Sequence, residues 1–139
     1  QEGHAEIIQL LLEAGAAIDQ ADAEGVTPLS AASQEGEIDC VRLMIAAGAT
    51  VNQADSDGAT PLYIACSQGH VECVRLLLEA SAAVNQADAD GTTPLSAASL
   101  AGKIDCVRLM IAAGAAVNQA DSEGFTPLYI ACQESHLEC

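Results

Sequence analysis

The apolar residues between positions 24 and 56 fall into two short runs, and a glycine closes each run. The first run starts at Pro28 and consists of small side chains. The threonine before it can cap a helix, and proline suits the first helical position. The second run, Ile38 to Ala46, is apolar on almost every side, with a narrow polar stripe on which Asp39 and Arg42 are spaced to form an ion pair. Because a helix that is so widely apolar must be buried on several sides, we predict a pair of short helices that needs neighbouring units to cover it.

The same unit returns every 33 residues along the chain. After the second helix, an Asn-Gln-Ala-Asp stretch leads to an acidic residue and a glycine, which predicts an extended segment with a turn. Four series of residues keep this step: Thr27-Pro28, Thr60-Pro61, Thr93-Pro94 and Thr126-Pro127; Gly25, Gly58, Gly91 and Gly124; Cys40, Cys73, Cys106 and Cys139; Asp22, Asp55, Asp88 and Asp121. A fixed period of this length predicts a stacked array of repeats rather than a globule.

Three kinds of segment make the repeat resemble an ankyrin repeat: Asp90-Gly91-Thr92-Thr93-Pro94-Leu95, then Gly69-His70-Val71-Glu72, and Leu76-Leu77-Leu78-Glu79-Ala80 followed by Val84-Asn85. The resemblance covers essentially the whole chain. It implies an all-α solenoid of stacked helix-turn-helix units, with β-turn fingers that project sideways. We expect one domain over residues 1–139, with a partial repeat at 1–23, full repeats at 24–56, 57–89 and 90–122, and a partial repeat at 123–139.

One departure from the ankyrin pattern falls after each Thr-Pro-Leu, where the family usually has histidine. This chain has a hydroxyl-bearing residue instead, at Ser30, Tyr63, Ser96 and Tyr129. These hydroxyls can partly replace the hydrogen bond that the family makes between threonine and histidine.

A second, longer period of 66 residues makes segments 26–73 and 92–139 near copies that differ at eleven positions. Seven of the differences lie beside the finger glycine or at the end of the first helix, whereas the predicted back of the second helix is unchanged. The resemblance implies that these two zones line a concave face that holds partners. Drift of exposed positions is the alternative explanation. The predicted partner-binding residues are Glu24, Val26, Gln34, Glu35, Asp57, Ala59, Ser67, Gln68, Asp90, Thr92, Leu100, Ala101, Glu123 and Phe125.

Charge narrows the choice of partner. Four Lys and Arg against twenty Asp and Glu leave a net charge of −16, which opposes binding to nucleic acid and to anionic membranes. No apolar run approaches the roughly 20 residues that span a bilayer. We therefore expect a protein partner, with a basic segment that meets the acidic fingers.

The acids of the fingers form two series. The inner series, Asp22, Asp55, Asp88 and Asp121, is expected to hold the turns through local hydrogen bonds. The outer series, Glu24, Asp57, Asp90 and Glu123, either contacts a partner or is ordinary surface charge. A calcium site is disfavoured, because no single loop offers the six or more oxygen ligands that calcium prefers.

Few bulky groups are expected at the surface. Phe125 and Leu100 replace smaller or polar residues of the other copy, and we expect them to anchor a partner, although single exposed apolar residues are common. Tyr63 and Tyr129 either pack between first helices or meet a ligand.

The spacing Cys66-His70-Cys73, repeated at Cys132-His136-Cys139, resembles a metal site. The histidine, however, falls in the Gly-His turn typical of the family, also present as Gly3-His4, and the cysteines fall at core positions. We therefore expect small buried thiols and no metal or other cofactor. Reduced thiols suit a cytoplasmic or nuclear protein, although a bond within either Cys pair stays open.

No nucleophile, phosphate loop or pair of convergent carboxylates stands apart from the repeat pattern, so we expect no enzyme activity. The expected function is a protein–protein interaction module. The alternative is a structural or scaffold section of a longer or designed array.

The two ends each hold half a repeat. Residues 1–4 align with residues 133–136, which predicts a lone second helix from Ile7 to Ala14 and a lone first helix from Pro127 to Ser135. Neither end has a polar capping repeat. Truncation from a longer array is the favoured explanation, and head-to-tail association of the two half-repeats is the alternative.

Overall fold

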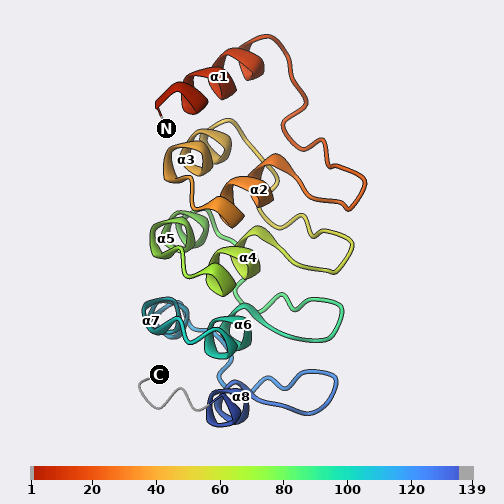
Figure 1. The fold of residues 1–139 in the computed structure, drawn as a ribbon, viewed down its shortest axis with the longest axis vertical. Helices are drawn as coiled ribbons and strands as arrows, with labels where there is room; N and C mark the ends of the chain where they lie inside the picture. Colours follow the sequence, from red (N-terminus) through yellow and green to blue (C-terminus); the bar gives the residue numbers. More distant parts are fainter. Residues whose placement is uncertain (1, 135–139) are drawn as a thin grey trace.

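The computed structural model describes residues 2–134, which form a single stack of helices (Figure 1). Second helices lie in one column, first helices in a second column, and the fingers project from the same side of the stack. Within the described residues all regular structure is helical, as the sequence predicted for an all-α solenoid. The helices are α1 (Glu2–Glu13), α2 (Pro28–Glu35), α3 (Ile38–Ala46), α4 (Pro61–Gln68), α5 (Val71–Glu79), α6 (Pro94–Leu100), α7 (Ile104–Ala112) and α8 (Pro127–Gln133).

Each first helix begins at a Thr-Pro pair. The hydroxyl of Thr27 accepts a hydrogen bond of 3.2 Å from the backbone N–H of Ser30, which satisfies one of the free donors at the start of α2. Thr27 Oγ1 also donates to Ser30 Oγ over 3.1 Å, so the serine hydroxyl does replace the histidine of the family pattern. At the other end, Gly36 adopts a left-handed conformation with φ 71° and closes the helix.

The second helices are covered on several sides, as their apolar surface requires. In α3, whose bounds match the prediction, Cys40, Val41 and Met44 are buried. The polar stripe carries the expected ion pair, with Arg42 Nη1 3.1 Å from Asp39 Oδ1 at the surface. Such exposed pairs contribute little to stability, so packing between repeats holds this helix.

Successive repeats are joined by contacts about one repeat apart in sequence. First helices α2, α4, α6 and α8 pack in order, and so do second helices α1, α3, α5 and α7. Asn52 Oδ1 accepts a hydrogen bond of 2.8 Å from the backbone N–H of Ala83, and Asn85 Oδ1 repeats this bond with Ala116. Each repeat is therefore fixed in register by its neighbours.

The first turn of the chain differs from the prediction. Gly3 and His4 lie inside α1, which begins at Glu2 rather than at Ile7, so they form no Gly-His turn. In the interior repeats such a glycine ends a first helix, as Gly69 ends α4 with φ 79°. No first helix precedes α1 in the structure, so nothing there has to end. At the other terminus α8 ends at Gln133, and Ser135 lies outside the described residues.

Candidate interaction surface

The inner acids of the fingers hold the turns. Asp55 Oδ1 accepts hydrogen bonds of 2.9 Å from the backbone N–H groups of Asp57 and Ala59. The same pair of bonds is made by the other three inner acids, Asp22, Asp88 and Asp121. Because these carboxylates are occupied by the backbone of their own turn, the structural role predicted for the inner series is confirmed.

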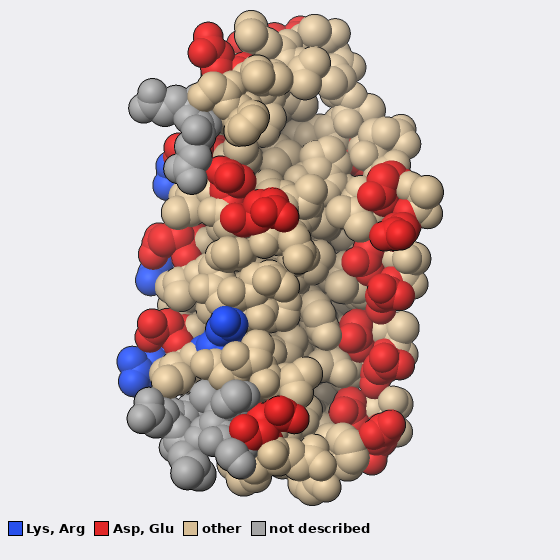
Figure 2. Space-filling model, viewed as in Figure 1, with Lys and Arg blue, Asp and Glu red and all other residues tan. Residues whose placement is uncertain are grey.

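The backbones of the outer acids join one finger to the next. The carbonyl oxygen of Glu24 accepts a bond of 2.9 Å from the N–H of Ser56, and the carbonyl of Asp57 does the same for Ala89. The side chains of the outer series, Glu24, Asp57, Asp90 and Glu123, are all exposed. Figure 2 shows acidic side chains along the edge where the fingers lie, with no basic side chain among them.

The opposite edge of the stack has a different pattern. There acidic and basic side chains alternate (Figure 2), because each second helix from α3 to α7 carries an ion pair three residues apart. The pairs are Asp39–Arg42 at 3.1 Å, Glu72–Arg75 at 3.5 Å and Asp105–Arg108 at 3.5 Å. Three of the acids on this edge are paired with arginine, whereas the acids along the fingers have no basic side chain beside them.

The ends of the first helices supply the second predicted zone. Gln34, Glu35, Gln68, Leu100 and Ala101 are exposed, and Leu100 keeps 49% of its surface accessible. Ser67 is half-buried, and its hydroxyl donates to the carbonyl of Ile64 over 2.9 Å. This zone mixes amide, carboxylate and apolar groups, so its chemistry changes from repeat to repeat.

The residues that follow the finger glycines are less accessible than the prediction assumed. Val26, Thr92 and Phe125 are half-buried, and Ala59 is only 8% exposed. Ala59 is therefore the one residue of the predicted contact set that is buried, so the prediction that it meets a partner is wrong.

Phe125 does not stand alone. Its ring stacks on that of Tyr129, with the ring centroids 4.6 Å apart and the planes 11° from parallel. Such a pair is rigid and presents one flat apolar surface. Tyr129 remains exposed, so the two rings form an aromatic patch at the C-terminal end of the predicted surface.

A contact that the sequence did not indicate links Tyr63 to the next finger. The Tyr63 hydroxyl is hydrogen-bonded to the carboxylate of Asp88, and the ring is half-buried. Burial, followed by the nearby charge of Asp88, raises the pKa of Tyr63 to about 12. The tyrosine therefore packs between repeats instead of facing a ligand. Tyr63 and Asp88 are 25 residues apart, so no local sequence pattern predicts their contact.

The histidine of the metal-like motif also has a structural role. His70 Nε2 lies 3.0 Å from the carbonyl oxygen of Gln34 in the preceding repeat, and its ring covers Gly36 so closely that a Cβ there would lie 2.5 Å from Nδ1. Cys66 and Cys73 are both free and buried. In the part of the chain that the structure describes, no three metal-binding side chains come together.

The thiols of the interior repeats behave as core residues, as predicted, but the prediction is wrong for Cys132, because no following repeat covers α8 within the described residues. Cys40, Cys66, Cys73 and Cys106 are buried, whereas Cys132 is exposed. Burial raises the pKa of the Cys66 thiol well above its usual value, with a smaller contribution from Cys106. A raised pKa leaves little thiolate, so these buried groups are poor nucleophiles. Cys139 lies outside the described residues.

No helix within residues 2–134 is long and apolar enough to cross a membrane. Among comparisons with known proteins, the family model for ankyrin repeats in three copies matches residues 1–88 and 80–139. No curated protein matches the chain. Ankyrin repeats are in general protein–protein interaction modules, and they are typically not catalytic. Since the family model spans both halves of the stack, the chain belongs to the ankyrin-repeat family.

Proposed function

We propose that this ankyrin stack binds a protein partner on the concave face formed by its fingers and first-helix ends, and that the outer acids contact a basic segment of that partner. The observation that carries the proposal is the row of four exposed carboxylates, Glu24, Asp57, Asp90 and Glu123, along an edge without a basic side chain. On the second helices, by contrast, Asp39, Glu72 and Asp105 each have an arginine partner.

The geometry favours binding because the row is held in place before a partner arrives. Each outer acid lies within a turn that an inner aspartate closes with two hydrogen bonds, and neighbouring fingers are joined through their backbones. Ordering a flexible loop at an interface costs free energy, and a finger that is already ordered avoids most of that cost. The spacing between repeats then sets the spacing of the charges.

Electrostatics and packing contribute differently to the proposed interface. A row of like charges accelerates the encounter with a basic segment and is screened by salt. Affinity that survives at high salt needs apolar anchors. Two exposed groups of the proposed face suit this role: Leu100, and Tyr129 with its ring stacked on the half-buried Phe125.

The proposal is tested with two variants that remove the same number of charges. The outer-acid variant carries Glu24→Gln, Asp57→Asn, Asp90→Asn and Glu123→Gln. The control variant carries Asp39→Asn, Glu72→Gln, Glu79→Gln and Asp105→Asn, all on exposed positions of the second helices. Each protein is immobilised under reducing conditions and used to capture proteins from a cytosolic and nuclear lysate, which fits the free thiols.

The account predicts that the wild type and the control capture the same proteins, and that the outer-acid variant loses them while its helix content stays unchanged. Captured proteins that bind the outer-acid variant equally well contradict the role of the outer acids. Failure of all three proteins to capture anything favours the alternative of a scaffold section, which the close similarity of alternate repeats also supports.

A further inference from the structure

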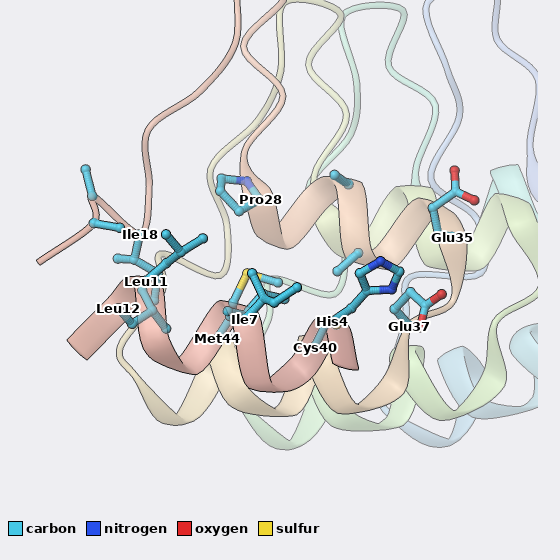
Figure 3. A pocket seen from close by; sticks show the side chains of 15 residues that line it. His4, Ile7, Leu11, Leu12, Ile18, Pro28, Glu35, Glu37, Cys40 and Met44 are labelled. Carbon is cyan, nitrogen blue, oxygen red and sulfur yellow. The ribbon is translucent and has the colours of Figure 1, made fainter. Parts of the chain in front are cut away.

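An apolar groove of about 450 Å³ lies between α1 and α2 at the N-terminal end of the stack. Ile7 and Leu11 of α1 point into it, opposite Pro28 of α2 (Figure 3). These two α1 side chains are 52% and 54% exposed. Apolar side chains of this size are seldom left open to water in such a group.

Comparison with the next repeat shows which helix packs beside the residues equivalent to Ile7 and Leu11. One repeat further on, Ile7 and Leu11 correspond to Cys40 and Met44, which are buried. In that repeat the first helix, α2, packs against the second helix, α3. Ala31 of α2 also lines the groove and is exposed, whereas its equivalents in α4 and α6 are buried. The groove therefore has the position and the apolar lining of a first-helix site.

The other end of the chain displays a helix of this kind. α8 is a first helix, and it shares the sequence Pro-Leu-Tyr-Ile-Ala-Cys with α4. In α4 the leucine, Leu62, is 1% exposed because α5 packs over it, whereas Leu128 of α8 is 73% exposed. Within the described residues, α8 lacks the second helix that would cover it.

We propose that the 139-residue chain associates head to tail, with α8 of one copy docked in the groove between α1 and α2 of the next. The two surfaces differ, so the contact is heterologous and can continue from copy to copy. The apolar contact does not involve the side chains of the outer acids, so the variants that test it differ from those that test the function proposed above.

Polar groups at the two ends support this register. Asn85 Oδ1 accepts a hydrogen bond from the N–H of Ala116, 31 residues later, and this bond recurs between repeats. One repeat after Asn85, the equivalent acceptor is Asn118, which is exposed. The equivalent donor would be the N–H of Ala17 in the second copy. Within residues 2–134, neither Asn118 Oδ1 nor the N–H of Ala17 makes the hydrogen bond that its equivalents make between interior repeats.

The fingers would be joined in the same way. The carbonyl oxygen of Asp90 accepts a bond of 2.9 Å from the N–H of Ser122. One repeat later the acceptor is the carbonyl of Glu123, and the matching donor is the N–H of Ala23 in the second copy. Docking of α8 thus aligns apolar groups and hydrogen-bonding groups together, in the arrangement found at the interior junctions.

Two segments compete for the second-helix position beside the docked α8. They are residues 134–139 of one copy and residues 2–7 of the next, which have equivalent positions in the repeat. α1 is the stronger competitor for the place beside α8. It is a 12-residue helix that contains Ile8 and Leu11. The segment 134–139, in contrast, has only two apolar residues in its sequence, Leu137 and the terminal Cys139. Since apolar area drives packing, α1 is the better partner for α8.

Light scattering of the chain across a concentration series, with reducing agent present, tests the proposal. The average mass should rise with concentration. Leu128→Glu and Ala31→Glu place a charge on opposite sides of the junction, and each should weaken association by about tenfold or more. Ile38→Glu is the matched control, because it places the same charge on an exposed apolar residue within the stack and should associate as the wild type does.

Mixing the two junction variants separates head-to-tail docking from other association. Leu128→Glu keeps an intact groove and Ala31→Glu keeps an intact α8, so an equimolar mixture should form a dimer of one chain of each kind and nothing larger. A wild-type mass that stays at one chain up to about 1 mM overturns the proposal. So does a mixture that remains single-chain or grows beyond two chains, or an Ile38→Glu variant that is weakened as much as the other two.

Discussion

Helices α4 and α8 begin with the same six residues, Pro-Leu-Tyr-Ile-Ala-Cys, and have the same Thr cap. In α4 the leucine and the cysteine are buried, because repeats lie on both sides and α5 lies behind. In α8 the leucine and the cysteine are exposed. Local sequence therefore decides that both segments become helices, and neighbours decide what each side chain contributes.

This difference explains how one sequence pattern provides both core and surface. A solenoid repeat contacts only its neighbours, so its stability is close to a sum of its own contribution and the contributions of the adjoining interfaces. The interior repeats bury most of their apolar residues in those interfaces and expose mainly the fingers, the first-helix ends and the polar stripe of each second helix. The terminal helices keep apolar residues at the surface, where they can meet another chain.

The largest contrast is expected in thiol reactivity. In a Cys139→Ser variant, Cys132 of α8 should react with iodoacetamide at least about 100-fold faster than Cys66 of α4, because the buried thiol is reached only through local opening. Burial also raises the pKa of Cys66, which lowers its thiolate fraction at any given pH. Mass spectrometry of peptides at timed intervals measures both rates, and equal rates would remove the distinction between the two helices.

Truncating the shared leucine should separate the helices in stability. Leu62→Ala removes a fully buried side chain and should lower the free energy of unfolding by about 2–5 kcal/mol. Leu128→Ala removes an exposed one and should change it by less than about 0.5 kcal/mol. Urea unfolding followed by circular dichroism gives both values. A large loss in Leu128→Ala at a concentration where the chain is single would mean that α8 is covered within one copy.

The shared tyrosine offers a pH test of the same contrast. In a Tyr129→Phe variant, titration of tyrosinate absorbance reports Tyr63 alone and should give a midpoint near 12. Because the folded state raises the pKa of Tyr63, the stability associated with its protonated hydroxyl is complete below the ordinary value of about 10 and is lost as the pH rises towards 12. Substitution of Asp88 by Asn should lower the midpoint. A midpoint near 10 in the parent variant would mean that the hydroxyl is not held between the repeats.

The smallest expected effect concerns one loop. Ser81 has φ 65°, where Gly15, Gly48 and Gly114 stand in the other repeats. A side chain in this left-handed region costs free energy, so Ser81→Gly should raise the free energy of unfolding by at most roughly 1 kcal/mol. The greater conformational freedom of glycine in the unfolded chain offsets part of this gain. Ser81→Ala retains the strained conformation and serves as the control. A loss of stability in Ser81→Gly would mean that the serine side chain stabilises the loop.

Much of the fold could be predicted because its signals are local and repeated. A Thr-Pro start and a glycine stop gave the bounds of α2, and the apolar run gave those of α3. The Gly3-His4 turn was predicted wrongly, because a turn signal acts only where a preceding helix has to end.

The candidate site was harder to predict, because exposure depends on neighbours. Sequence placed Ala59 at the surface, yet it is buried. The bond between Tyr63 and Asp88 and the contact of His70 with Gln34 join residues of adjoining repeats, and no local pattern indicates which side chains meet across a junction. The inner aspartates were predicted correctly, since their partners lie within the same turn.

Amide hydrogen exchange, resolved by helix at a concentration where the chain is single, shows whether neighbouring repeats or local sequence stabilise the helices. The six-residue segment shared by α4 and α8 has the same intrinsic chemistry in both places, so any difference in protection comes from neighbours. The account predicts that the amides of α4 exchange at least about 100-fold more slowly than those of α8. Equal protection of the two segments would show that local sequence, rather than stacking, stabilises the helices, and would contradict the account.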